Sequence, residues 1–232
     1  MLSKKQMTAV VAEFLGAGIL TFGFLAVSRS AIGVPYFIAI GVGLAFAMIV
    51  LVLGSVSQTH ANPAVTLAMW TVRKIKTLDA VLYIAAQFIG AVAVYKLYEY
   101  LVVQGVQSIA PAEFDWRVLV AEAVGAFVFV FGFAAAVFKK YTGGTLASTL
   151  ALSLIVGILV AGVASNGIIN PAAALGVQSW DRSYLLGPII GGILGANLYV
   201  LLFAPEASLK ALVSTASKSK KSPAKSKKKS KK

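Results

Sequence analysis

The sequence predicts an all-α membrane protein in which six transmembrane helices and two half-helices form an inverted 3+3 repeat. Three observations lead to this fold class: the composition, six long apolar runs and a repeated Asn-Pro-Ala tripeptide. Of the 232 residues, 59% are hydrophobic and only 12% are charged, and the mean hydropathy is +0.85. Soluble domains have roughly a quarter of their residues charged. The composition therefore excludes an ordinary soluble globular domain.

Six apolar runs have the length of about 20 residues that is needed to cross a ~30 Å hydrocarbon core. They are residues 7–27, 34–56, 78–103, 118–138, 145–164 and 184–203. The first run is too long and too rich in glycine for a signal peptide, it contains Glu13, and no cleavage signal follows it. We expect it to remain in the mature protein as the first span.

The lysines and arginines predict the orientation, because cationic loops stay on the cytoplasmic side of a membrane. Of the 21 Lys and Arg residues, 17 fall on one side of the predicted spans. They are Lys4, Lys5, Arg73, Lys74, Lys76, Lys139, Lys140 and ten lysines of the C-terminal tail. The other side has only Arg29, Arg117 and Arg182, and the remaining Lys96 lies within the third predicted span. We therefore expect a multi-pass protein with both termini in the cytoplasm.

Two further apolar stretches, residues 62–72 and 170–180, are too short to cross a bilayer. Each opens with Asn-Pro-Ala, and Asn is a favoured helix N-cap while Pro is favoured as the first helical residue. At a rise of 1.5 Å per residue, each stretch gives a helix of about 16 Å, half the hydrocarbon thickness. Lipid cannot satisfy the backbone of the loops that lead into such half-helices. They must lie inside the protein or along a watery cavity.

The chain also repeats itself. Glu13 and Glu122 each lie near the start of a span, and the spacing between them matches that between Asn62 and Asn170 to within a single position. We expect two units, at about residues 7–104 and 116–204, each consisting of span, span, half-helix, span. Because three spans is an odd number, the second unit enters the membrane from the opposite side. Inverted repeats place their sites near the midplane, where discontinuous helices point their N-termini inward.

These residues resemble the aquaporin, or major intrinsic protein, family between residues 10 and 203. The resemblance depends on Ala12-Glu13-Phe14 in the first span, His60-Ala61-Asn62-Pro63-Ala64-Val65-Thr66, Glu122, and Ile169-Asn170-Pro171-Ala172 with Gly176. It implies a six-helix bundle whose half-helices meet end to end, with a pore in each subunit of a homotetramer. The central filter that it implies consists of Asn62, Pro63, Ala64, Asn170, Pro171 and Ala172.

The predicted function is a passive transmembrane channel for water and small neutral solutes. Each half-helix carries roughly +0.5 elementary charge at its N-terminus, and two such ends at the pore centre disfavour cations and hydronium. The amides of Asn62 and Asn170 can donate hydrogen bonds to a passing water and orient it. No step needs catalysis or a cofactor, and a chain with one histidine and no cysteine has little material for a metal site.

Three other polar residues are candidates for supporting roles. Carboxylates inside spans have functional or buried structural roles, because exposing them to lipid costs several kcal/mol. For Glu13 and Glu122, the family suggests that they accept hydrogen bonds from the loops before the half-helices, with a proton relay as the alternative. His60 matches the family's position on the cytoplasmic approach to the pore. It could be a plain loop residue or a pH-sensitive gate.

The outer constriction departs from the family pattern, because Ala173 stands where most members have arginine. Counting without gaps, the other constriction positions are Val42, Ile158 and Gly167, so all four residues are apolar or small. Such a ring could admit glycerol, urea or ammonia besides water, could dewet and conduct poorly, or could exclude cations less strictly. We favour the first. The aspartate that often follows the arginine in glycerol facilitators is also absent, with Ala174 in its place.

We expect residues 1–205 to form the channel domain and residues 206–232 to be a disordered Lys- and Ser-rich cytoplasmic tail. The tail carries ten lysines, so residues 1–209 have only eleven Lys and Arg against eight Asp and Glu. The tail could be a solvated topology signal or could contact anionic lipid. No folded reader or interleaved aromatic residue accompanies it, which argues against nucleic acid. For the whole chain, a coupled secondary transporter and a non-conducting membrane scaffold remain the alternatives.

Overall fold

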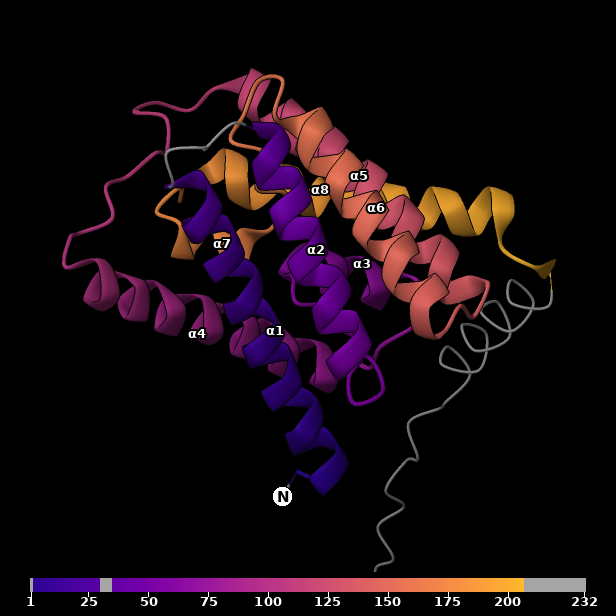
Figure 1. The fold of residues 1–232 in the computed structure, drawn as a ribbon. Coiled ribbons are helices and arrows are strands. Elements are labelled where there is room, and N and C mark those ends of the chain that lie inside the picture. Colours follow the sequence, from indigo (N-terminus) through magenta and orange to yellow (C-terminus); the bar gives the residue numbers. More distant parts are fainter. Residues whose placement is uncertain (1, 30–34, 207–232) are drawn as a thin grey trace, which may run out of the picture.

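The computed structural model describes residues 2–29 and 35–206, and eight α-helices lie within these ranges (Figure 1). They are α1 (Lys4–Ser28), α2 (Pro35–Leu53), α3 (Pro63–Thr71), α4 (Thr77–Val102), α5 (Trp116–Phe138), α6 (Gly143–Ala161), α7 (Pro171–Gly176) and α8 (Arg182–Phe203). Six are long and apolar enough to cross a membrane, and α3 and α7 are the short ones. The all-α fold class with six spans is confirmed. The predicted tail, residues 206–232, lies outside the described residues except for Glu206.

The helices begin and end within a few residues of the predicted spans. The first helix starts earlier, at Lys4, because its polar first turn has a capping box. The Ser3 hydroxyl accepts the backbone N–H of Gln6 at 3.2 Å, and the Gln6 side chain accepts the Ser3 N–H at 3.1 Å. A hydrophobicity scan does not detect such a turn, since it contains few apolar residues.

The second half-helix is shorter than predicted, and the expected range of 170–180 is wrong at its end. Helix α7 has six residues and stops at Gly176, after which Gln178 adopts a left-handed backbone (φ 60°). The N–H of Ser179 turns back to the carbonyl of Ala174 at 2.8 Å and closes the helix end. A side chain at Gly176 would overlap Thr21, so the close approach of α7 to α1 at this position needs a glycine.

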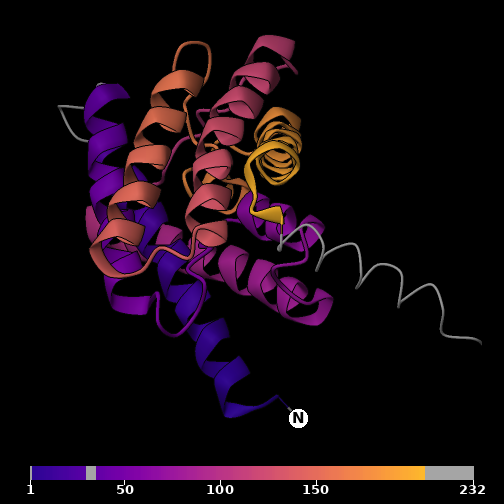
Figure 2. The same ribbon diagram turned by 90° about the vertical axis from the view of Figure 1, so that its right-hand side faces the viewer.

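The contacts between helices follow the predicted repeat. Helix α1 packs on α2 and α4, and its counterpart α5 packs on α6 and α8. The half-helix α3 packs on α8, and its counterpart α7 packs on α4. Helices α2 and α6 contact each other across the two units, and so do α3 and α7. Figure 1 and Figure 2 both show α5 and α6 side by side. Each half-helix therefore lies against the last helix of the other unit as well as its own.

Glycines allow the closest helix approaches at matching places in the two units. A side chain at Gly90 of α4 would overlap the backbone carbonyl of Phe14 in α1. A side chain at Gly191 of α8 would likewise overlap the carbonyl of Ala123 in α5. Phe14 and Ala123 each follow the buried glutamate of their helix. Small residues at helix crossings are typical of packing in lipid, where close van der Waals contact replaces the hydrophobic effect.

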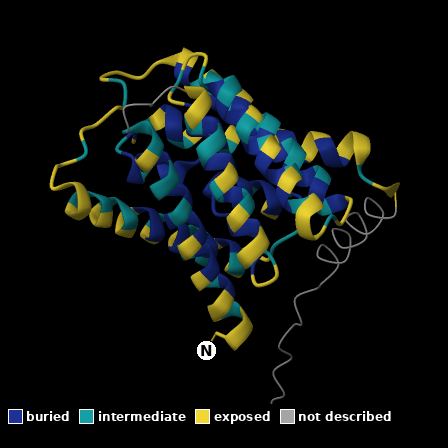
Figure 3. Cartoon of the chain, viewed as in Figure 1, coloured by how far each residue is buried: buried dark blue, intermediate teal, exposed yellow. Residues whose placement is uncertain are grey.

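The two ends of the bundle differ in charge. One end, the lysine-rich face, gathers the start of α1, the end of α2 and the segment before α4, with Lys5, Lys74 and Lys76 around one cavity. Lys74 also lies over the ring of Phe138, at the end of α5. The opposite face gathers Ser28, Pro35, Ile109 and Gly162 around a second cavity. Figure 3 shows exposed residues along the outward sides of the helices, and many are large and apolar, as lipid contact requires.

Candidate functional site

The two half-helices begin in the same way. The side-chain oxygen of Asn62 accepts the N–H of Ala64 at 2.8 Å, and that of Asn170 accepts the N–H groups of Ala172 and Ala173 at 3.1 and 3.3 Å. Pro63 and Pro171 are the first helical residues, where the missing N–H has no cost. Each Asn-Pro-Ala tripeptide therefore caps its own helix through the asparagine oxygen.

The asparagine nitrogens join the two half-helices. Asn62 Nδ2 donates to the carbonyl of Ile169 at 2.9 Å, and Asn170 Nδ2 donates to the carbonyl of Ala61 at 3.0 Å. The two residues are 2% and 3% exposed. An amide nitrogen carries two hydrogens, so each asparagine keeps one N–H without an acceptor among the residues described. The structure thus brings the six predicted central residues together around the meeting point of two helix N-termini.

The loop residues before each asparagine have an unusual backbone. Ala61 and Ile169 have φ values of 46° and 45°, in the left-handed region. This conformation is rare for a β-branched residue such as Ile169 and costs on the order of 1–3 kcal/mol. It turns the carbonyls of Ala61 and Ile169 towards the asparagine of the other half, where they accept the bonds just described.

The two buried glutamates hold these strained loops. Glu13 accepts the N–H groups of His60 and Ala61 at 3.0 and 2.7 Å, and Glu122 accepts those of Ile168 and Ile169 at 3.0 and 2.6 Å. Both glutamates are 0% exposed. Each hydrogen bond that the described residues make to the two carboxylates comes from a donor. In this geometry the carboxylates accept hydrogen bonds from the loops that precede the half-helices.

Further hydroxyl and amide groups complete the carboxylate sites, and sequence reasoning missed them. Ser57 donates to Glu13 at 2.8 Å, and Ser165 donates to Glu122 at 2.7 Å. These serines have the same spacing as Asn62 and Asn170, so a residue-by-residue comparison of the two units could have found them. Gln87 of α4 donates to Glu13 at 2.7 Å and has no such signal in the sequence.

His60 lies in a fully buried polar and aromatic setting. Its Nδ1 is 3.1 Å from the Thr66 hydroxyl, and its Nε2 is 3.3 Å from Oε1 of Gln58. The rings of Tyr83 and Phe133 contact the imidazole edge to face at centroid distances of 5.6 and 5.7 Å. Burial lowers the pKa of His60 below the usual 6.5, and the charge of Glu13 only partly opposes this. The imidazole is therefore neutral at physiological pH.

An aromatic chain extends from His60 to α2 and was also missed. Phe133 contacts Phe129 at a centroid distance of 6.2 Å, and Phe129 contacts Phe46 at 5.7 Å. All three phenylalanines are at most 1% exposed. In the sequence they are indistinguishable from the other apolar residues of α2 and α5.

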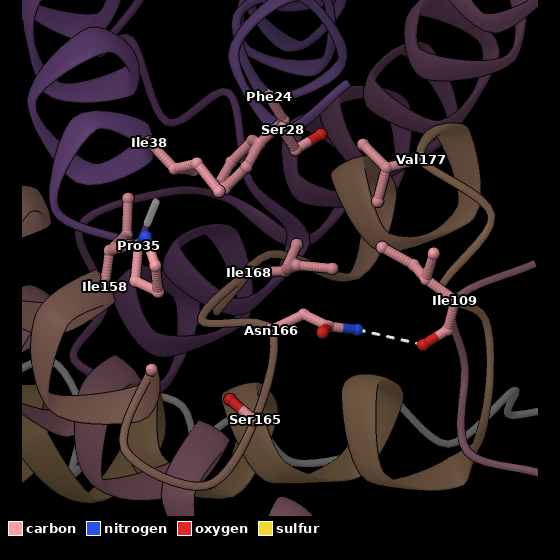
Figure 4. Close-up of a pocket in the computed structure, with 11 residues that line it drawn as sticks. Phe24, Ser28, Pro35, Ile38, Ile109, Ile158, Ser165, Asn166, Ile168 and Val177 are labelled. Carbon is pink, nitrogen blue, oxygen red and sulfur yellow. Dashed lines mark hydrogen bonds between the residues drawn. The ribbon is translucent and has the colours of Figure 1, made fainter. Parts of the chain in front are cut away.

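Two cavities enter the bundle from its two ends. The cavity at the lysine-rich face has a volume of about 680 Å³ and includes Ser57, Gln58 and Tyr83 in its lining. The cavity at the opposite face has a volume of about 220 Å³ and a mainly apolar lining (Figure 4). Ile168, which corresponds to His60 in the other unit, lines this second cavity. The segments before the two asparagines therefore line the two different cavities.

The four residues expected at the outer constriction are only partly brought together. Ile158 lines the cavity at the opposite face, and Gly167 packs against it so closely that a side chain at Gly167 would meet the Ile158 carbonyl. Val42 and Ala173 are 0% and 1% exposed. On α2 the cavity is lined by Pro35 and Ile38, and Ile38 lies one turn before Val42. The assignment of Val42 to the outer constriction stays a prediction.

Comparison with known proteins connects this geometry to a family. The sequence profile of the major intrinsic proteins matches residues 1–199. The chain belongs to the major intrinsic protein family. Members of this family are channels rather than enzymes. Among the residues described here, no three His, Asp or Glu side chains lie together as a metal site would need.

Several major intrinsic proteins are similar to the chain over most of its length. Aquaporin-4 of Dipodomys merriami is 34% identical over 183 residues, which cover 72% of this chain and 56% of that protein. Aquaporin Z of Photorhabdus laumondii is 27% identical, covering 86% of this chain and 99% of that protein. The structure of the aquaglyceroporin from Plasmodium falciparum superimposes with a TM-score of 0.71 at 21% identity, covering 88% and 99% of the two chains. The chain thus spans little more than half of aquaporin-4, and the last comparison concerns the fold.

Proposed function

We propose that this major intrinsic protein is a passive channel for water and small neutral solutes. The observation that carries the proposal is the meeting of two capped half-helices at Asn62 and Asn170. Each asparagine keeps one amide N–H, so a water or solute oxygen that passes between them meets two donors. The aquaporins and the aquaglyceroporin to which the chain is similar support this proposal.

Selectivity against protons and cations follows from the same geometry. The N-termini of α3 and α7 place partial positive charge where the half-helices meet, and this charge disfavours cations. Two donors also force a central water to use its oxygen as an acceptor on both sides, which interrupts a relay of protons along a single file. Cation exclusion in this channel therefore depends on helix ends and amides, because Ala173 supplies no charge.

The missing arginine supports passage of neutral solutes such as glycerol, urea or ammonia. The cavity at the opposite face is lined largely by isoleucine, valine, phenylalanine and proline. Val42, Ile158, Gly167 and Ala173, the proposed outer constriction, add no charged side chain to it. A solute that is too wide or too apolar for a charged filter meets less resistance here.

Stopped-flow light scattering of proteoliposomes tests this proposal. Vesicles with the protein should shrink faster than empty vesicles under an osmotic step and re-swell as glycerol or urea enters. Ala173→Arg should suppress re-swelling more than shrinkage, because it returns a charged donor to the constriction. Ala173→Met is the matched control for side-chain length without charge.

Each result decides between the candidate functions. Flux that stays proportional to the solute gradient supports a channel, and flux that saturates indicates a coupled transporter. Shrinkage no faster than in empty vesicles, with reconstitution verified, would contradict the open channel and leave a dewetted pore or a scaffold.

The proposal includes orientation, assembly and the tail. The lysine-rich face is placed in the cytoplasm, with both termini, because cationic segments stay on that side. The tail lysines are placed near anionic lipid, which would attract them at about 1 kcal/mol per residue. Deletion of the residues after Pro205 should leave the permeability per inserted channel unchanged. A homotetramer, which the family resemblance implies, is tested by native mass spectrometry.

A further inference from the structure

The mainly apolar cavity at the opposite face is lined by Asn166, an exposed polar side chain that hydrogen bonds hold in one orientation. Asn166 lies across its floor, among Ile109, Ile168 and Ser165 (Figure 4). Its backbone N–H donates to the Tyr184 hydroxyl at 3.0 Å, which ties the residue to α8. The position of this asparagine is therefore set by tertiary contacts.

The orientation of the Asn166 amide follows from its partners. Nδ2 donates to the carbonyl of Ile109 and to the Ser179 hydroxyl, both at 3.0 Å. A backbone carbonyl can only accept, so the nitrogen and not the oxygen must face Ile109. Both amide hydrogens are thus used, and Oδ1 faces away from them. No donor among residues 2–29 and 35–206 contacts this oxygen.

The other unit explains why this oxygen has no partner. Gln58 is the counterpart of Asn166 at the repeat spacing of the two asparagines, and it lines the cavity at the lysine-rich face. Its nitrogen also donates to a backbone carbonyl, that of Lys74, at 3.2 Å, but its oxygen lies 3.3 Å from Nε2 of His60. In the second unit Ile168 stands at the position of His60. The imidazole nitrogen that lies against one amide oxygen is therefore absent at the other.

We propose that Oδ1 of Asn166 is a solute contact of the outer cavity and biases the channel towards neutral solutes rich in N–H donors, such as urea. This inference rests on the proposed channel function. A second polar group supports it, since Oγ of Ser28 lines the same cavity and has no hydrogen-bond partner among residues 2–29 and 35–206. Ala173 stands in place of a fixed cationic donor, so the cavity at the opposite face offers the amide oxygen of Asn166 as a fixed acceptor. The isoleucines that line this cavity face the apolar side of the solute. Asn166 is thus a specificity-determining residue in this protein.

Urea and acetamide provide a matched pair of probes, because they have the same shape and differ by one NH₂ in place of CH₃. Proteoliposomes with the full chain should admit urea in preference to acetamide. Asn166→Leu removes the acceptor and should lower the urea-to-acetamide permeability ratio by about fivefold, the effect of one hydrogen bond. Asn197→Leu makes the same substitution at an exposed asparagine of α8 that does not line this cavity, so it should leave both the ratio and the water permeability unchanged.

A second variant tests the inference without changing Asn166. Ile168→His introduces the imidazole found in the other unit. When its Nε2 carries the proton, it should donate to Oδ1 of Asn166 and lower the urea-to-acetamide permeability ratio. This variant tests the inference even if Asn166→Leu does not reconstitute. A channel that conducts with an unchanged ratio in both variants would overturn this inference and leave the proposed function standing. An equal fall in Asn197→Leu would show that the effect does not come from the acceptor in the cavity and would also overturn it. No flux in the unmodified protein would overturn both proposals.

Discussion

The substitution Glu122→Gln tests whether the buried carboxylate holds the strained loop before the second half-helix. Oε1 accepts from Ile168 and Ser165, and Oε2 accepts from Ile169 at 2.6 Å. Glutamine keeps one oxygen but places an NH₂ group against one set of these donors. The change loses a bond to a charged group, about 1.5–3 kcal/mol, and leaves a buried donor unsatisfied, about 1–3 kcal/mol more.

The expected destabilisation is therefore about 3 kcal/mol or more. For a protein of this length, each 1 kcal/mol lowers the Tm by about 2–4 °C, so the Tm should fall by roughly 6–12 °C. Thermal unfolding in detergent, followed by tryptophan fluorescence, measures this shift. Glu13→Gln should have an effect at least as large, because Gln87 also donates to Glu13.

Glu113→Gln is the matched control, because Glu113 is exposed in the segment between α4 and α5. It should leave the Tm within about 2 °C of the original protein. If Glu122→Gln behaves like this control, the carboxylate does not support the loop, and the structural role given to it here is refuted.

Further outcomes follow from the packing, the titration of His60 and the composition. Gly191→Ala should abolish the folded protein, since its methyl group would overlap the Ala123 carbonyl. Gly144→Ala is the control and should fold normally, because nothing lies within 4 Å of the added methyl group. Size-exclusion profiles in detergent distinguish the two outcomes. Water permeability should be constant between about pH 6.5 and 8, because the lowered pKa keeps His60 neutral. Below pH 6.5 the histidine of the unfolded chain binds a proton more readily than the folded His60 does, so the Tm should decrease as the pH is lowered. A Tm that increases as the pH is lowered would contradict the burial of this residue. Mercurials should not block the flux, because the chain has no cysteine, and block reversed by a thiol reductant would disprove this.

The spans and the central filter could be predicted from the sequence because their signals are local. A run of about 20 apolar residues has few stable alternatives to a transmembrane helix. Asn-Pro-Ala encodes a helix start through two adjacent residues, and the structure has α3 and α7 beginning at Pro63 and Pro171. Glu13 and Glu122 are separated by nearly the same number of residues as Asn62 and Asn170. This matching separation reveals the repeat even though most residues of the two units differ.

The outer cavity could not be predicted in the same way. On α2 the residues Pro35 and Ile38 line it, and their position relative to the strained loops depends on the length and path of the segment before α3. The early end of α7 depends on the contact of Gly176 with α1. Asn166 was not singled out, because its orientation requires Ile109, Ser179 and Tyr184 from three other segments.

The sequence by itself determined that this protein is a six-span membrane protein of inverted repeats, with two half-helices that begin at Asn62 and Asn170. Hydrophobic length, helix capping and residue spacing act over short stretches of chain, so they can be read without coordinates. Only the tertiary structure decided which loop carbonyls, carboxylates and amides meet at the centre and at the mouths. Those meetings join residues from opposite halves of the chain, as in the bond from Asn170 to Ala61, and they depend on how the helices pack.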